Sequence, residues 1–120
     1  MFPEAQRVLT EFGNLRFGDR NDYVELDPSL GENGADEILP FQEELGTRLY
    51  PVGIMEHQDR VYLVVDEKGL VYTVLLDELE PFASSFDQAI EFLVRPAINR
   101  REWEDDLRSV GLVGKVWKSR

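Results

Sequence analysis

The chain has 120 residues and an apolar fraction of 42%, which predict one domain with a packed core. It contains no cysteine, which excludes disulfides, thiolate nucleophiles and cysteine-ligated zinc sites. The net charge of −11 argues against nucleic acid or an anionic membrane as a partner, and it favours a basic partner. Such acidity can also serve solubility alone, so the charge by itself does not define a function.

The first third of the chain predicts a helix, two short strands and a second helix. A helical repeat of apolar residues ends near Gly13, at Ala5, Val8, Leu9 and Phe12. Alternating apolar residues then predict two half-buried strands, around Leu15–Phe17 and Val24–Leu26. Turn formers predict a loop over 27–34. We expect the next helix over Asp36–Leu45, with Pro40 near its first turn and its end at Gly46.

The middle of the chain predicts an antiparallel meander. A first strand over Leu49–Ile54 contains Pro51, which requires a sheet edge or a bulge. Two β-branched and aromatic runs follow, Val61–Val65 and Leu70–Leu75. The four residues between them, with Gly69 available for a positive φ, have the length of a hairpin loop.

The last third predicts two helices. Ser85 and Gln88 have the spacing of a capping box, and the apolar face of that helix consists of Phe86, Ala89, Ile90 and Leu93, before Pro96. A final helix is predicted over Arg100–Val110, with Trp103, Leu107 and Val110 on one face and a tail loosened by Gly111 and Gly114. The order of elements predicts an α+β fold, in which helices pack on one face of an antiparallel sheet.

No pattern of residues predicts catalysis, a cofactor or a metal. The single histidine, His57, lies in a polar turn, and the pairs Glu43-Glu44 and Asp105-Asp106 lie in polar helical segments. The loop that starts at Asp27 lacks the glycine and the final glutamate of a calcium-binding EF-hand. An acid-dependent enzyme would need a buried carboxylate with a shifted pKa in a cleft. We therefore expect a binding module rather than an enzyme.

Four ordered segments carry a family resemblance, and together they cover roughly residues 5–94. The first contains Val8-Leu9 and Phe12-Gly13, in the pattern "vL-x-eFG-gL", with Asn14 in place of a second glycine. The others follow Asp27-Pro28 and are Glu44–Gly53, Leu63–Tyr72 and Phe86–Leu93. In this order they resemble the SUKH superfamily, particularly its third immunity-protein subgroup, many members of which have a further segment ahead of the first helix.

The resemblance implies a single SUKH-like α+β domain over residues 1–120, in which 97–120 form a C-terminal helix and a basic tail. It also implies an immunity protein that neutralises a cognate toxin of a polymorphic or contact-dependent system, often a nuclease or deaminase. Such toxins act on nucleic acid and tend to be basic, which fits an acidic chain. A regulatory or scaffold module of the same fold with a housekeeping partner is the alternative, and a toxin gene beside this one would distinguish them.

Charge predicts where a toxin would bind, because the family supplies no fixed interface residues. Between Asp19 and Glu44 the chain is strongly acidic, with Arg20 as the one basic residue. Tyr23 and Tyr50 are candidate aromatic anchors. The predicted contact residues are Asp19, Asp22, Tyr23, Glu25, Asp27, Glu32, Asp36, Glu37, Glu43, Glu44 and Tyr50.

The sequence also predicts a cytoplasmic protein. The N-terminus shows no basic segment followed by an apolar run, as a secretory signal would. The longest apolar stretches, Val61–Val65 and Leu70–Leu76, are too short to span a bilayer.

Overall fold

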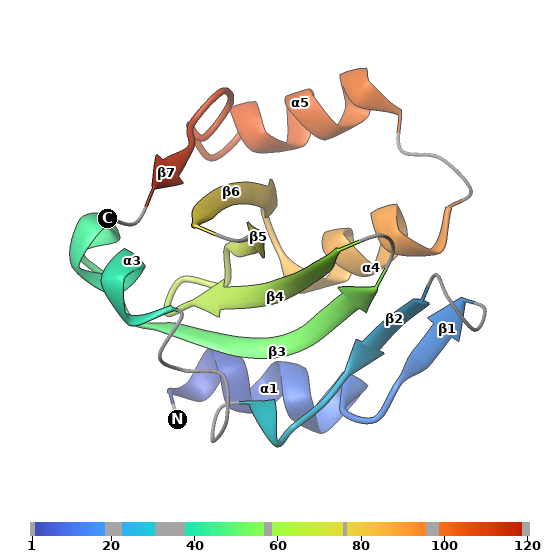
Figure 1. The fold of residues 1–120 in the computed structure, drawn as a ribbon. Helices are drawn as coiled ribbons and strands as arrows, with labels where there is room; N and C mark the ends of the chain where they lie inside the picture. The colour runs from blue at the N-terminus through green and yellow to red at the C-terminus, as the bar shows by residue number, and fades with distance from the viewer. Residues whose placement is uncertain are drawn as a thin grey trace.

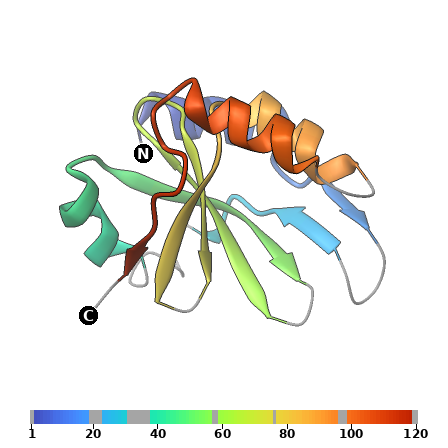
Figure 2. The ribbon, with the colours of Figure 1, turned by 90° about the horizontal axis from the view of Figure 1, so that it is seen from above.

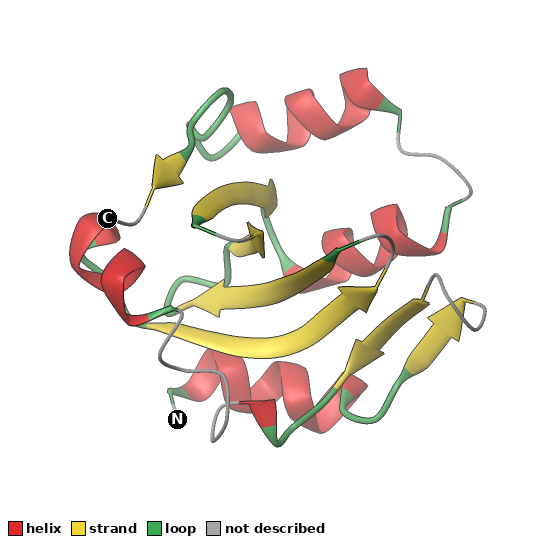
Figure 3. Ribbon diagram, in the orientation of Figure 1, coloured by secondary structure: helices red, strands yellow, loops and turns green. Residues whose placement is uncertain are grey.

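Seven antiparallel strands form one sheet whose spatial order, β1 to β7, is also the order of the sequence (Figures 1 and 3). This computed structural model describes residues 2–18, 23–30, 38–56, 59–75, 77–95 and 99–118. The strands are β1 (Arg16–Gly18), β2 (Tyr23–Leu26), β3 (Leu49–Glu56), β4 (Arg60–Asp66), β5 (Val71–Leu75), β6 (Glu78–Ala83) and β7 (Trp117–Lys118). The helices are α1 (Pro3–Phe12), α3 (Leu39–Leu45), α4 (Phe86–Val94) and α5 (Arg100–Arg108). The predicted α+β class with an antiparallel meander is confirmed.

Strand β3 contains the bulge that Pro51 requires. Pro51 pairs with Val64 of β4, but the next pair joins Gly53 to Leu63, so Val52 is the extra residue. Proline lacks an N–H for a ladder, and the bulge lets the strand continue past it. On its other side β3 pairs with β2 only from Gly53 to Glu56.

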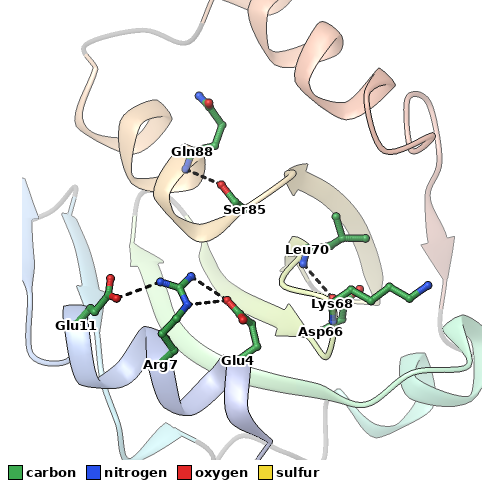
Figure 4. A network of polar contacts seen from close by, with 8 residues as sticks. All are labelled: Glu4, Arg7, Glu11, Asp66, Lys68, Leu70, Ser85 and Gln88. Atoms are coloured by element: carbon green, nitrogen blue, oxygen red, sulfur yellow. Dashed lines mark hydrogen bonds and ion pairs between the residues drawn. The ribbon is translucent and has the colours of Figure 1, made fainter.

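The turn between β4 and β5 is held by one buried carboxylate. Asp66 Oδ1 accepts hydrogen bonds from the backbone N–H groups of Lys68 and Leu70, both at 2.9 Å (Figure 4). Its Oδ2 accepts a bond from the hydroxyl of Tyr72 at 2.8 Å. Gly69 closes the turn at φ 92°, the conformation expected for it. The hairpin is therefore fixed by side-chain and backbone contacts of its own residues.

The core lies on both faces of the sheet, because successive side chains of a strand point to opposite faces. On β4, Leu63 and Val65 belong to one apolar cluster, with α1 and α4, whereas Val64 belongs to a second, with Phe41 of α3. Helices α1, α4 and α5 lie on the same side of the strands (Figure 2). Helix α3 and the C-terminal segment complete the second cluster.

The helix boundaries follow local signals in the sequence. Ser85 caps α4, since its Oγ accepts a bond from the N–H of Gln88 at 3.1 Å (Figure 4). Helix α3 has Pro40 in its first turn and ends at Gly46, which has a left-handed φ of 69°. Two residues of that predicted helix, Asp36 and Glu37, lie outside the described residues, as does Pro96.

The C-terminal half differs from the prediction in three features. Helix α5 ends at Arg108, so Val110 is exposed instead of continuing the apolar face. Strand β6 has no counterpart in the predicted elements, and it contains Pro81, a residue that sheet interiors usually exclude. The tail is not loose: it turns at Gly111 and Gly114, and β7 then pairs with Glu78–Leu79 of β6.

Candidate protein-binding surface

The predicted contact residues fall into three groups in the structure. Those that lie outside the described residues are Asp19, Asp22, Glu32, Asp36 and Glu37. Tyr23 and Glu25 lie on β2, beside the end of β3 at Glu56. Asp27, Glu43, Glu44 and Tyr50 lie toward the other end of β3, where α3 leads through Gly46 into Leu49. The described members therefore lie at two ends of the sheet.

Tyr23 and Glu25 share one arginine. Both side chains point to the same face of β2, since they are two residues apart in a strand. Arg16 of β1 lies over the Tyr23 ring, with its guanidinium carbon 4.1 Å from the ring centre. The same arginine is 3.7 Å from the Glu25 carboxylate. A partner at this end would meet a mixed surface of one aromatic ring and one ion pair.

Tyr50 and Asp27 already have contacts within the protein. The half-buried Tyr50 ring meets the ring of Phe2 edge-on, with 6.4 Å between their centres. Asp27 accepts bonds from the N–H and the hydroxyl of Ser29, at 2.9 and 2.7 Å. By contrast Glu43 and Glu44 of α3 are exposed, and neither forms an ion pair with the described part of the chain.

Most of the described basic side chains are already engaged in ion pairs with nearby acids. Arg7, for example, lies between Glu4 and Glu11 on α1, at 2.8 and 3.2 Å (Figure 4). The other engaged basic residues are Arg16, Arg48, Arg60, Arg95, Arg100, Arg108 and Lys118. These exposed pairs add little stability. Because these basic residues are already paired, the surplus negative charge at the surface is carried by carboxylates that have no cation partner.

Exposed carboxylates without an ion pair in the described ranges lie on three parts of the molecule. Glu43 and Glu44 lie on α3, and Asp87 and Glu91 lie on α4. The third part is the end of the sheet where β3 turns into β4 and β5 turns into β6. The acids there are Asp59, Asp77 and Glu80.

This end of the sheet also carries a hollow, which we call the hairpin groove. It has a volume of about 240 Å³ and is formed by side chains of β3, β4, β5 and β6. Its lining residues are Met55, Val61, Thr73, Leu75, Glu78, Glu80 and Phe82. Sequence reasoning did not find the groove, because four separate strands contribute to it and one of them, β6, was not predicted.

A second groove adjoins the first at Glu80. It has a volume of about 260 Å³ and lies between α5, β6 and the tail. Trp103 forms part of it and donates a hydrogen bond from Nε1 to the carbonyl of Phe82 at 2.8 Å. Exposed Val113 and Val116 contribute apolar surface on the tail side.

The described residues offer no constellation of catalytic or metal-binding groups. No group of three or more metal-ligating side chains occurs among them, and His57 lies outside them. Asp66 is the one charged side chain that is buried in the described part, and both of its oxygens bind groups of its own hairpin. Among the described helices, none is long and apolar enough to cross a membrane.

Comparison with known proteins identifies a family. A family model described as SUKH-3 immunity protein matches residues 1–95, from α1 through the end of α4. No curated protein and no solved structure gives a significant match. Helix α5 and strand β7 lie beyond the matched range, although both pack against β6 of the matched sheet.

Proposed function

Because this chain belongs to the SUKH-3 immunity protein family, we propose that it protects its cell by binding a cognate toxin domain in the cytoplasm. Binding, rather than chemistry on a substrate, is the proposed mode of action. A protein that covers the toxin's active surface blocks it without any catalytic group of its own. We treat residues 1–120 as one domain, since α5 and β7 pack on the same sheet as the matched elements.

We propose further that the toxin domain is basic, as nucleases and deaminases that act on nucleic acid tend to be. The observation that supports this most directly is the pairing of the arginines with carboxylates of the chain itself. Most described arginines already have a carboxylate partner, so a net charge of −11 leaves many acids unneutralised at the surface. A basic toxin would be attracted over several ångströms and would then neutralise those acids.

The proposed contact surface includes Glu43 and Glu44 of α3 and Tyr23 of β2. The two glutamates are exposed and adjacent, and they lie on a short helix fixed to the sheet by buried Phe41. Tyr23 of β2 adds an aromatic ring at the far end of β3, where it pairs with Glu56. A helix and a strand carry the three side chains, so little backbone entropy is lost on binding.

The test is neutralisation of the toxin domain encoded beside this chain's gene. We expect co-expression of the chain to restore growth to cells that produce the toxin domain. The two proteins should also purify as one complex in size-exclusion chromatography with light scattering. A toxin domain from an unrelated system serves as the control and should remain toxic. Persistent toxicity beside abundant, folded chain, with no complex, would contradict the proposal and favour a scaffold role.

A further inference from the structure

We infer that the hairpin groove receives an arginine or lysine side chain that projects from the toxin, an inference that rests on the function proposed above. The groove lies outside the acidic segment 19–44 that the sequence singled out. Its occupant follows from two properties of its lining, an apolar floor and an acidic rim.

The floor of the groove is apolar because of the strand register. Met55 of β3 pairs directly with Val61 of β4, and both are half-buried. Leu75 of β5, which is 38% exposed, pairs with Glu78 of β6. These side chains point to the face that α1 and α4 cover farther along the strands. Here no described helix covers them, so a side chain from outside can contact them.

The rim is acidic and is only partly neutralised. Glu80 is exposed and forms no ion pair among the described residues. The carboxylate of Glu78 lies 3.4 Å from Lys118, yet its side chain is still 42% exposed. Two cations line the adjoining groove, but Arg100 is paired with Glu104 at 2.8 Å, and Lys115 is not within ion-pair distance of Glu80. Space for an external cation therefore remains at Glu80.

A long basic side chain matches both properties at once. Arginine and lysine bury their aliphatic stems against apolar surface and keep the charged end in a polar environment. The stem would lie on Met55, Val61 and Leu75, and the charged end would reach Glu80 and Glu78. A purely apolar side chain would remove water from these carboxylates without replacing it, which is unfavourable. An acidic side chain would be repelled.

The experiment measures equilibrium binding of the co-encoded toxin domain to variants that each remove one negative charge or add one positive charge. Glu80→Gln removes the rim carboxylate. Thr73→Arg, which is opposite Glu80 in the β5–β6 ladder, places a cation of the chain's own in the groove. The matched control is Glu91→Gln on α4, an exposed glutamate whose loss changes the total charge as Glu80→Gln does. Thermal unfolding of each variant verifies that it is folded.

We expect Glu80→Gln and Thr73→Arg to weaken binding about 10- to 100-fold, the effect of losing one charged hydrogen bond. Glu91→Gln should change it less than about threefold, as expected for an exposed charge that does not line the groove. Amide signals of Leu75 and Glu80 should shift in NMR spectra when the toxin domain is added. If all three variants changed the affinity equally and slightly, and the Leu75 and Glu80 amide signals did not shift, the groove assignment would be overturned and the proposed function would not. Failure of the wild-type chain to bind would overturn the proposed function and the groove assignment together.

Discussion

Gly53 of β3 pairs with Leu26 of β2 at a point that leaves no room for a side chain. A Cβ added there would be 2.5 Å from Leu26 Cδ2 and 2.9 Å from the backbone carbonyl of Glu25. The carbonyl belongs to the ladder that joins the two strands, so it cannot move freely. We expect Gly53→Ala to lower the free energy of unfolding by about 1–3 kcal/mol, as overpacking does. Chemical denaturation measures this.

Gly46 supplies the comparison for that prediction. It adopts a left-handed φ of 69°, and no atom lies within 4 Å of an added Cβ. Gly46→Ala should therefore cost only the backbone strain of a side chain in that region, about 1 kcal/mol. If Gly46→Ala proved the more damaging change, the close contact at Gly53 would have to be relieved by movement of β2.

Tyr72 gives the protein a pH dependence above neutral. Burial raises the pKa of its hydroxyl above the usual 10, and the negative charge of Asp66 and the hydrogen bond to it act in the same direction. The folded chain therefore keeps a proton that the unfolded chain loses. The stabilisation is fully present below pH 10 and is lost as the pH rises above it. We expect a decline of up to about 1.4 kcal/mol per pH unit from this group.

Replacement of that hydroxyl isolates its contribution. In Tyr72→Phe the additional decline above pH 10 should disappear. Absorbance at 295 nm should also lose a late-ionising component, since burial and the negative charge of Asp66 delay the ionisation of Tyr72. Identical unfolding profiles of the two proteins between pH 9 and pH 11 would contradict the assignment.

The sequence predicted the residues whose role depends on their neighbours in the chain. Gly69 and Ser85 are such residues, and both have the predicted role. Asp66 was placed in the correct hairpin, but its burial was not foreseen. The buried carboxylate accepts a bond from the Tyr72 hydroxyl, which reaches Asp66 because the turn folds β5 back on β4. Contacts of this kind are set by register, which a local pattern does not encode.

One carboxylate links helix α5 to the end of strand β6. Asp106 accepts bonds from the N–H and the hydroxyl of Ser84, at 2.8 and 2.6 Å. We expect Asp106→Ala to destabilise the protein by about 1.5–3 kcal/mol, as the loss of hydrogen bonds to a charged group does. Hydrogen exchange at the Ser84 amide should become faster, because that N–H loses its acceptor.

Asp105 is the matched control for that helix. It is the adjacent aspartate, but it is exposed, and among the described residues its side chain binds Arg108 alone, at 2.5 Å on the same helix. Asp105→Ala should leave the stability almost unchanged, because exposed pairs of this kind contribute little. Equal losses from the two replacements would show that helix propensity, rather than the link to β6, holds α5 in place.

At the scale of elements, the sequence predicted those that carry a strong local pattern. Strands β4 and β5 are runs of β-branched and aromatic residues, and α4 has a clear cap and apolar face. Strand β6 was not predicted, and it contains Pro81, a residue that interior strands usually exclude. The structure accommodates Pro81 because β7 pairs only with Glu78 and Leu79. A two-residue strand such as β7 depends wholly on its partner, so no local pattern could have predicted it.

In the folded molecule, the acidic residues that the sequence places in one segment are separated. The acidic segment 19–44 is continuous in the chain, yet its described members lie at two ends of β3. Tyr23 pairs with Glu56, whereas Glu44 precedes the start of that strand at Leu49. Composition correctly indicated a surplus of negative charge. Its placement required the path of the chain, which also brings Glu80, from outside that segment, to the hairpin groove.

The last prediction concerns the rate of association, which long-range attraction to a basic toxin should raise. Glu44→Lys and Glu91→Lys change the net charge equally, and both alter exposed glutamates, one on α3 and one on α4. If the charge on α3 faces the incoming toxin, Glu44→Lys should slow association several-fold at low salt, and Glu91→Lys should slow it much less. Stopped-flow measurements at increasing salt should show the two rates converge near 1 M, where the screening length is about 3 Å. Equal slowing by both variants would mean that the total charge, and not the position of α3, directs the encounter.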